Sequence, residues 1–439
     1  MEYITVKQKI ETKLIIIIGL IVLLLIPIFM IQNLIDERSE LQQQVQVDIA
    51  KSSSDEQQVI GPFIHAQYLE TVTVDGKTSE QLMNMTLLPE SLKVSSNLAT
   101  FEKYRGIYKA LLYRSQNQFE GRFKTSALAV LADKKIKRLN LILAISDIRG
   151  IGQGSHINVN ERSYELLPGT QLDQLPQGIR VELDYEAIRK SEVLPYQIDL
   201  NLQGMRQLSF APVGKNSSLT MQADWPHPSF VGDYLPIESS ISARDFSASW
   251  QTNYFATNLK ELFNQCLFRN ECTLFKQRNM GVNLVDSVNH YLKNYRASNY
   301  AILVIVLIFA SFFLLEVLRD EPIHPVQYGF VGLALAVFYL LLISLSEHLG
   351  FNIAYLLSAL ASAILLSVYV AGMLKNSKHG GLFLCGVLFL YSLLYGLLSA
   401  EDYALLMGSV LVFVVLSLIM LLTRRVNWYG RHAQDDETN

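Results

Sequence analysis

Long apolar runs are unevenly distributed along this 439-residue chain. One run covers residues 14–31 (LIIIIGLIVLLLIPIFMI), and five more are crowded between residues 300 and 422. No run between residues 32 and 298 is long enough to cross a bilayer, which takes roughly 20 apolar residues for about 30 Å of hydrocarbon. The pattern predicts one N-terminal membrane helix, a large water-facing segment and a C-terminal bundle of membrane helices.

Polar and charged residues divide the C-terminal region into separate spans. These breaks predict five helices, at 300–318, 326–345, 351–374, 382–398 and 403–422. With 14–31 they make six transmembrane helices. The predicted organisation is a cytoplasmic N-terminus (1–13), transmembrane helix 1 (14–31), a water-facing domain (32–298), a five-helix membrane domain (299–422) and a cytoplasmic tail (423–439). Because the first run is longer than the apolar part of a signal peptide and no small-residue cleavage pattern follows it, we interpret it as an uncleaved anchor.

Basic residues near the span ends predict the orientation, since they favour the cytoplasmic side. They precede the first span and follow the second, fourth and sixth, whereas loops 346–350 and 399–402 contain none. This predicts a bacterial inner membrane protein with both termini in the cytoplasm and residues 32–298 in the periplasm of a Gram-negative cell. Lys293 and Arg296 precede the second span on the outer side, but long domains translocate largely regardless of charge.

The water-facing segment has the short apolar and alternating runs that are typical of strands. They lie at 139–145, 180–185, 197–202, 207–211, 218–223 and 246–252. Because no regular alternation of strands and helices is evident, these runs predict a β-rich domain that is antiparallel and sandwich-like. The polar stretch 36–58 is interpreted as a continuation of the first helix or a linker. Two further stretches, 253–275 and 282–295, are interpreted as helical.

Charge and cysteine content narrow the possible chemistry. The net charge of −3 gives no electrostatic reason to expect nucleic acid as a partner. Cys266 and Cys272 lie close together in NQCLFRNEC, so they either form a disulfide, if that side of the membrane is oxidising, or remain two free thiols. Because no second pair of Cys or His lies at zinc-finger spacing, we predict no metal site.

The sequence lacks the common signatures of catalysis and cofactor binding. The chain has no GxSxG, Walker, HExxH or GxGxxG motif, so we predict no catalytic residue and no cofactor. The run GIGQG at 150–154 is interpreted as a flexible turn rather than a nucleotide-binding loop. In DWPHPSF (224–230), Trp225 and His227 belong either to a binding edge or to a proline-stiffened loop whose aromatic rings plug the sheet, and we favour the loop.

Ionisable residues at or near the predicted membrane boundaries form the second group of candidates. Glu316 lies in the last turn of the second span, where Arg319 could pair with it at i,i+3. Glu347 and His348 follow the third span and would cap helix ends at the outer interface, and His324 precedes Pro325 at the cytoplasmic interface. Structural roles are favoured. Because ionisable groups at membrane depth are costly and often functional, the alternative is a proton relay or a site for lipid headgroups.

Several long sequence blocks together resemble one known family. They are RGIYKALLY (105–113), SDIRGI (146–151), FAPVGKNSSL (210–219), DWPHPSFVGDYLP (224–236) and HPVQYGFVGLALAVFYLLLISLSEHLGFNIAYLLSALA (324–361). In this order they are similar to the CreD family of inner membrane proteins. The resemblance covers about 101–422, and the N-terminal part departs from it, apart from a short Gly-Pro element in IGPFI (60–64).

The resemblance implies a role in cell-envelope integrity. In enteric bacteria it implies a link to the CreB/CreC two-component system, to colicin tolerance and to the response to β-lactam stress. It provides no catalytic residues to transfer. Expected partners are the lipid bilayer and an envelope protein or a cell-wall component, with the oligomeric state left open. The alternative is a transporter or a membrane enzyme that handles lipid or cell wall through Glu316, Glu347 and His348. A third hypothesis is a sensor that signals through a partner protein.

Overall fold

The computed structural model describes residues 2–424 except 75–76, 286–289, 320–322 and 400–403. The chain divides into two compact units. The helical unit comprises Met1–Gln42 and Val288–Asn439, and the β unit comprises Gln43–Ser287. The first helix, α1 (Glu2–Ser52), is continuous and contributes residues to both units. The polar stretch after the first apolar run is therefore helical as far as Ser52, rather than a linker.

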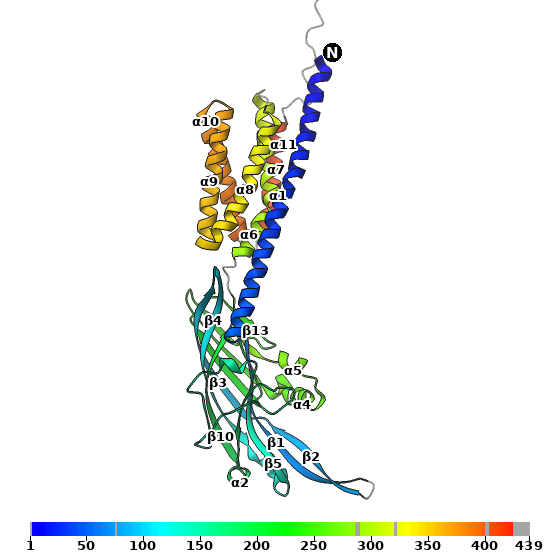
Figure 1. The fold of residues 1–439 in the computed structure, drawn as a ribbon, viewed down its shortest axis with the longest axis vertical. Coiled ribbons are helices and arrows are strands. Elements are labelled where there is room, and N and C mark those ends of the chain that lie inside the picture. The colour runs from blue at the N-terminus through cyan, green and yellow to red at the C-terminus, as the bar shows by residue number, and fades with distance from the viewer. Residues whose placement is uncertain (1, 75–76, 286–289, 320–322, 400–403, 425–439) are drawn as a thin grey trace, which may run out of the picture. The chain divides into compact units, whose positions relative to one another are not determined.

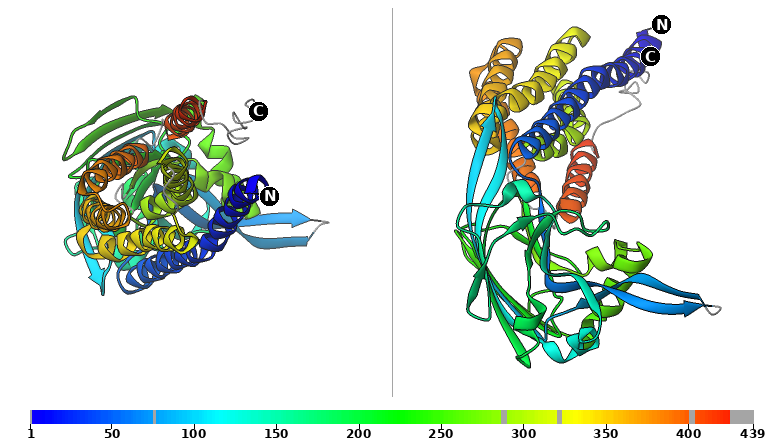
Figure 2. Two further views of the ribbon diagram at one scale, coloured as in Figure 1. Left: turned by 90° about the horizontal axis from the view of Figure 1, so that it is seen from above. Right: turned by 60° about the horizontal axis from the view of Figure 1, so that its bottom comes forward.

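The β unit contains two eight-stranded sheets within the described residues (Figure 1). The first has the order β13-β16-β11-β1-β5-β9-β8, and β2 pairs with β1. Its strands are β1 (Gln57–Val74), β2 (Lys77–Leu87), β5 (Lys135–Ile145), β8 (Leu167–Pro168), β9 (Gly178–Glu182), β11 (Gln207–Ala211), β13 (Pro228–Val231) and β16 (Met280–Leu284). As Figure 2 shows, β1 and β2 continue as a long hairpin beyond the neighbouring strands.

The second sheet has the order β14-β15-β12-β3-β4-β10-β6-β7. Its strands are β3 (Ser91–Arg105), β4 (Tyr108–Lys124), β6 (His156–Val159), β7 (Arg162–Tyr164), β10 (Val193–Met205), β12 (Asn216–Ala223), β14 (Glu238–Ile241) and β15 (Phe246–Asn253). Short helical turns η1 (Thr125–Leu131), η2 (Ile148–Gly150) and α2 (Tyr185–Ile188) connect the strands. The predicted β-rich domain is therefore confirmed.

The prediction that the sheets are antiparallel holds for most neighbouring strands but is wrong for two pairs. β1 pairs in parallel with β11, and β3 pairs in parallel with β12. In each case the strands are far apart in the chain, and the connection between them passes through both sheets. Alternation of apolar residues reports which face of a strand is buried, but it carries no information about the direction of the neighbouring strand.

Aromatic side chains from both sheets meet in the core. Phe119 of β4 and Phe210 of β11 lie edge to face with ring centroids 5.7 Å apart. Phe230 of β13 and the fully buried Trp250 of β15 make a similar contact at 5.7 Å. Along β12 the side chains alternate between buried and exposed positions, as expected for a strand with one face on a core. The two sheets therefore form a sandwich around one apolar core.

The region 253–295 differs partly from the helices that its sequence predicts. Residues 253–275 do contain helices, α3 (Tyr254–Thr257), α4 (Leu259–Arg269) and α5 (Thr273–Gln277). The start of 282–295 is instead strand β16, because it is hydrogen-bonded between β11 and β13 and its residues Val282 and Leu284 are buried. Helix α6 (His290–Asn299) covers the later part of this stretch.

The helical unit is built from six further helices within the described residues. They are α6 (His290–Asn299), α7 (Ala301–Arg319), α8 (Pro325–Leu349), α9 (Phe351–Met373), α10 (Ser377–Ser399) and α11 (Ala404–Thr423). α1, α8, α9 and α10 are long and apolar enough to cross a membrane, and the pair α6–α7, bent by 41°, is a fifth candidate if it forms one span. The predicted helical bundle is confirmed, and α11 covers the last predicted run. The total of six spans stays a prediction.

Small residues and buried aromatic rings bring the helices of this unit together. A Cβ atom at Gly332 of α8 would lie 2.1 Å from Leu24 of α1, so the absence of a side chain allows these two helices to approach closely. Phe338 of α8 stacks on Tyr391 of α10 with centroids 4.6 Å apart. The hydroxyl of Tyr355 in α9 donates to the carbonyl oxygen of Tyr391 at 2.7 Å.

Candidate functional site

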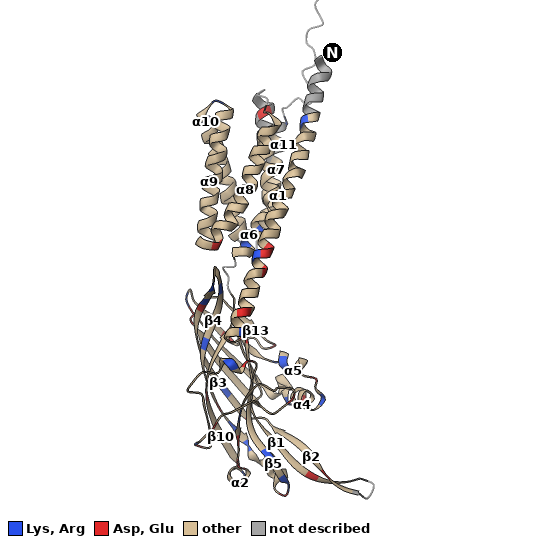
Figure 3. Ribbon diagram, viewed as in Figure 1, with Lys and Arg blue, Asp and Glu red and all other residues tan. Residues whose placement is uncertain are grey.

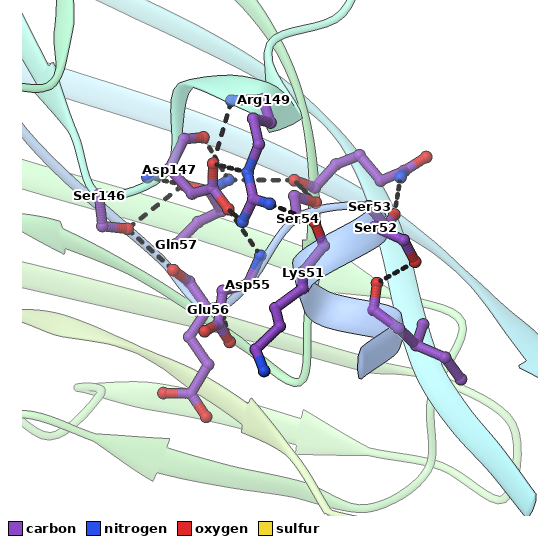
Figure 4. A network of polar contacts seen from close by, with 12 residues as sticks. Lys51, Ser52, Ser53, Ser54, Asp55, Glu56, Gln57, Ser146, Asp147 and Arg149 are labelled. Atoms are coloured by element: carbon purple, nitrogen blue, oxygen red, sulfur yellow. Dashed lines mark hydrogen bonds and ion pairs between the residues drawn. The ribbon is translucent and has the colours of Figure 1, made fainter. Parts of the chain in front are cut away.

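A buried polar network joins the end of α1 to β1, η2 and β10 in the β unit (Figure 4). At its centre is Asp147, which lies just before η2 and has only 10 % of its side chain exposed. Its carboxylate accepts hydrogen bonds from Arg149 Nε at 2.9 Å and Nη2 at 2.6 Å, and from the backbone N–H of Asp55 at 3.0 Å. Burial by itself raises the pKa of Asp147, but these donors and the charge of Arg149 outweigh it and hold the pKa below its ordinary value.

Gln57 carries the network into the adjoining strands. Its side-chain amide donates to the carbonyl oxygen of Asp147 at 2.9 Å and to that of Gln203 at 3.1 Å. A Cβ atom at Gly150 would lie 2.2 Å from the Gln203 carbonyl oxygen, so only glycine fits against this strand. Residues 150–154 therefore contain a close backbone contact at their first position, which the interpretation as a flexible turn did not include.

The network also caps the C-terminal end of α1. Arg149 Nη1 donates to the carbonyl oxygen of Lys51, in the last turn of the helix. The last carbonyl groups of a helix have no partner within the helix and carry partial negative charge, so a guanidinium there is favourable. Ser54 Oγ donates to the Gln203 carbonyl oxygen at 2.7 Å immediately after the helix. The arrangement holds the end of α1 against the sandwich.

Glu316 is part of a contact among three helices of the helical unit. Its carboxylate, with 14 % of the side chain exposed, pairs with Lys13 of α1 and accepts a hydrogen bond from the hydroxyl of Tyr328 in α8 at 3.2 Å. The predicted pairing with Arg319 concerns a side chain outside the described residues. The observed partners come from helices that are distant in sequence, so spacing along α7 could not predict them.

Glu347 occupies a second contact, in the last turns of α8. Its carboxylate, with 12 % of the side chain exposed, accepts a hydrogen bond from the Tyr291 hydroxyl at 2.9 Å and lies 3.9 Å from Arg38 Nε of α1. Nearby, Asn294 Nδ2 of α6 donates to Ser346 Oγ at 2.6 Å. Glu347 thus joins α1, α6 and α8. Figure 3 shows that α8, α9 and α10 carry their few acidic and basic residues only near their ends.

The two acidic residues do not share a site. Glu316 contacts Tyr328 in the first turn of α8, and Glu347 lies 19 residues further along that helix. At 1.5 Å per residue they are about 28 Å apart. The partners of both residues on α1, Lys13 and Arg38, lie one on each side of the apolar run 14–31. A relay that uses Glu316, Glu347 and His348 as one group is therefore not favoured.

The two histidines of this group differ in their surroundings. His324 caps α8: its Nδ1 accepts the backbone N–H of Val326 at 3.3 Å, and its own N–H donates to Gln327 Oε1 at 2.9 Å. With Pro325 as the first helical residue, this is a good helix start and explains the HPVQ sequence. His348 is exposed in the last turn of α8.

The loop after β12 contains Trp225 and His227. Trp225 is half-buried, and its Nε1 donates to the carbonyl oxygen of Val285 at 3.1 Å. Exposed His227 lies edge to face with the Trp225 ring, at 6.4 Å between centroids, and its carbonyl oxygen accepts the N–H of Val285. Asp224 accepts the backbone N–H of Thr100 at 2.7 Å. These contacts attach the loop to β3 and to the end of β16.

A small hollow lies beside this loop. Its volume is about 30 Å³, enough for about one water molecule. It is lined by Gln46, Glu102, Lys109, Leu111, Arg206, Trp225 and Leu284. Among the described residues, no group of three or more His, Cys, Asp or Glu side chains is arranged to hold a metal ion.

Cys266 and Cys272 are joined in a disulfide, with Cα atoms 4.2 Å apart. The bond links α4 to the start of α5, and Cys266 is fully buried. This is one of the two arrangements that the sequence left open.

The sequence identified the acidic candidates Glu316 and Glu347 but not the side chains that contact them. Lys13, Arg38 and Tyr291 are each distant in the chain from the acidic residues they contact. In the sequence, Asp147 and Arg149 stand out only as part of the family-like block SDIRGI. An aspartate and an arginine two residues apart can form a bidentate ion pair. A glycine directly after the arginine is a signal for a close approach of the backbone to another strand.

Comparison with known proteins agrees with the sequence blocks. The family model described as "Inner membrane protein CreD" matches residues 9–429. Inner membrane protein CreD of Escherichia coli (strain K12) is 36% identical over 430 residues, which cover 97% of this chain and 95% of that protein. The resemblance inferred from the motifs is thereby confirmed. The chain belongs to the CreD family of inner membrane proteins.

Proposed function

We propose that this protein supports the integrity of the cell envelope and its response to antibiotic stress, as a non-enzymatic protein with a periplasmic β unit. The observation that carries the proposal is the way α1 is held. It is one continuous helix from Glu2 to Ser52, paired to the helical unit through Lys13 and Arg38 and capped in the β unit by Arg149. The same helix thus contributes residues to both the helical unit and the β unit.

The polar contacts favour a structural role for these residues over a catalytic one. The acidic candidates Glu316 and Glu347 are engaged by cations of α1, and Asp147 is engaged by Arg149. Each of these contacts connects elements of the fold. The β unit would supply the surface for an envelope protein or a cell-wall component, and the bundle would hold that surface at the membrane.

Exposed apolar side chains on the β unit are suitable positions at which to crosslink a binding partner. Phe255 is 93% exposed in α3, just after β15, and Leu235 and Ile237 are 73% and 62% exposed in the segment before β14. Large exposed apolar groups often belong to interaction sites. A photo-reactive residue at Phe255 should crosslink one envelope component in living cells, whereas one at exposed Lys190 should not. The same adducts from both positions would contradict a specific partner at Phe255.

The phenotype itself is tested by deletion. Cells that lack the gene should become more sensitive to detergent or to cell-wall antibiotics, and the full-length protein should restore resistance. The variant H348N, at equal protein level, should also restore it, because exposed His348 performs no chemistry in this proposal. Failure of that variant, with the protein folded and present, would favour the transporter or enzyme alternative. Unchanged sensitivity and shape after deletion would contradict the envelope role.

The orientation has its own test. A disulfide persists in an oxidising compartment, and the Cys266–Cys272 bond therefore supports the periplasmic side for the β unit. With Cys385 replaced by serine, a membrane-impermeant thiol reagent should label a V130C variant in intact cells, because that site is 62% exposed. It should label the half-buried Cys272 only after reduction. Labelling of Cys272 without reductant, or of position 130 only after lysis, would overturn the proposed side.

A further inference from the structure

The edges of the two sheets are not alike. Four of the strands at these edges, β7, β8, β13 and β14, contain three, two, four and four residues. Pro168 lies in β8 and Pro228 in β13, while β7 begins with Arg162 and β14 with Glu238. Short strands, prolines and charged residues are the usual protection of a sheet edge against pairing with another chain. These four edges are therefore protected.

Strand β2 lies at a fifth edge and differs from the other four. It has 11 residues, and within the described part of the chain it pairs only with β1. Its register with β1 is continuous from end to end, without a bulge. From residue 78 to residue 87 the sequence contains no proline, no glycine and one charged residue, Glu80. Apart from Glu80, this part of β2 has none of the features that protect the other edges.

The middle of β2 is open to solvent. All side chains from Ser79 to Asn84 are exposed, with Leu82 at 54% and Met83 at 36%. Successive side chains of a strand point to opposite faces, so Leu82 and Met83 place one apolar group on each face of the sheet. Met85 and Leu87 pack against the core near the end of the strand. Figure 2 shows the hairpin of β1 and β2 extending away from the neighbouring strands of the sheet.

The backbone of β2 determines which kind of molecule fits its free side. In an antiparallel pair, the N–H and C=O groups of alternate residues point to the partner strand, and those of the residues between them point to the opposite side. Among the described residues, no strand pairs with these outward groups of β2. Another polypeptide in an extended conformation offers donors and acceptors at the same spacing, whereas a glycan chain has no such series.

We propose that the free side of β2 binds an extended polypeptide segment of an envelope protein, which adds a strand to the first sheet. The added strand pairs with residues 79–84, and its apolar side chains contact Leu82 and Met83. This inference rests on the function proposed above and gives the class of one partner of the β unit, a polypeptide rather than a cell-wall glycan. The site is separate from the crosslinking position at Phe255.

The first test measures strand pairing with the full-length protein in detergent. The probe is a fluorescent peptide with the sequence of residues 64–74 (IHAQYLETVTV), the segment of β1 that pairs with β2 on its other side. Fluorescence anisotropy should show saturable binding. Leu82→Lys should weaken binding several-fold, because a lysine on an edge strand opposes pairing. The matched control Val130→Lys, at another exposed apolar site, should leave binding unchanged. No binding to the wild type, or equal binding to L82K, would overturn the proposal.

Two N-methylated peptides test the geometry. One carries N-methyl groups at the even-numbered residues of the same sequence and the other at the odd-numbered residues. In an added strand, the N–H groups of one set donate to β2 and those of the other set face solvent. One peptide should therefore lose binding and the other should retain it. Equal binding by the two peptides would contradict strand pairing.

A photo-reactive residue at position 82 identifies the partner in living cells. It should give a protein adduct that the same residue at position 130 does not give. An adduct between two differently tagged copies of this chain would assign β2 to self-association, and adducts with glycan alone would overturn a polypeptide partner. Full rescue of a deletion strain by L82K would remove the link to envelope integrity. Unchanged sensitivity after deletion would count against the envelope function alone, because peptide binding is measured independently of it.

Discussion

At the scale of single residues, a buried histidine in the first sheet has a direct consequence for pH dependence. His65 of β1 is 6% exposed, and its Nδ1 lies 3.5 Å from Thr86 Oγ1. Burial lowers its pKa below the ordinary value of about 6.5, and a hydrogen bond with Asn84 only partly opposes this. The folded protein therefore favours the neutral imidazole.

Stability should consequently fall as the pH drops below about 6.5. A lowered pKa in the folded state means that the unfolded chain binds the proton more readily, so the contribution is complete above the unfolded pKa and is lost towards the folded one. The variant H65L should show a flatter melting temperature between neutral and mildly acidic pH than the wild type. H227Q, at an exposed site, is the control. Parallel curves for H65L and the wild type would contradict this role.

Gly150 gives a second prediction at this scale. A Cβ atom there would lie 2.2 Å from the Gln203 carbonyl oxygen and 2.5 Å from Gln57 Nε2. Gly150→Ala should therefore lower the free energy of unfolding by about 1–3 kcal/mol, a typical cost of overpacking. Gly152→Ala, where the nearest atom would be 3.1 Å away, should cost clearly less. Denaturant unfolding of the purified protein measures both, and equal losses would contradict the close approach at Gly150.

At the scale of elements, α1 is held to the helical unit by two pairs of unequal quality. Lys13 and Glu316 are both largely buried, whereas Arg38 is 40 % exposed and lies 3.9 Å from Glu347. Solvent weakens exposed pairs, and removing one partner of a buried pair leaves a costly isolated charge. The two pairs should therefore differ in how strongly their members depend on each other.

A double-mutant cycle measures that dependence. For Lys13→Leu and Glu316→Leu, the coupling in thermal unfolding should fall at the upper end of about 0.5–3 kcal/mol. For Arg38→Leu and Glu347→Leu, it should be smaller. Single removal of Glu316 should destabilise the protein more than removal of both Lys13 and Glu316. Equal couplings in the two cycles would contradict the difference in burial.

The strands also show which elements the sequence pattern can predict and which it cannot. The run 207–211 was predicted as a strand and is β11, and 246–252 lies within β15, because both have apolar residues on a buried face. β3 and β4 were missed, since polar Ser96 and Asn117 occupy buried positions and hydrogen-bond each other at 2.7 Å across the pair. That partner lies on another strand, and single-strand periodicity cannot reveal it.

At the scale of the whole molecule, the apolar runs were sufficient to predict a helical bundle and a separate β-rich domain. The limits of the units were less predictable. α1 continues 21 residues beyond Ile31, and the compact β unit covers Gln43–Ser287. The polar residues of 36–52 are equally compatible with a linker, and only their packing against β4 and Met205 makes the end of this stretch an ordered helix.

Continuity of α1 gives a prediction about the whole protein. One alanine inserted after Glu40 should rotate everything beyond it by about 100° about the helix axis, whereas seven residues should restore the phase to within about 20°. The one-residue insertion should therefore abolish rescue of envelope sensitivity in a deletion strain, and the seven-residue insertion should retain part of it. Equal rescue by both, at equal protein level, would indicate that the rotational setting of the β unit is unimportant.

The two parallel pairings also constrain how the protein is made. β1 pairs with β11 at Gln57 and Leu208, 151 residues apart, and β3 pairs with β12 at Ser91 and Asn216, 125 residues apart. A ribosome releases β1 and β3 long before their neighbours exist, so both sheets remain open at these edges until the later strands emerge. Contacts this distant in sequence form slowly, and unpaired strand edges invite aggregation. The nascent β unit must therefore be shielded until β11 and β12 have been synthesised.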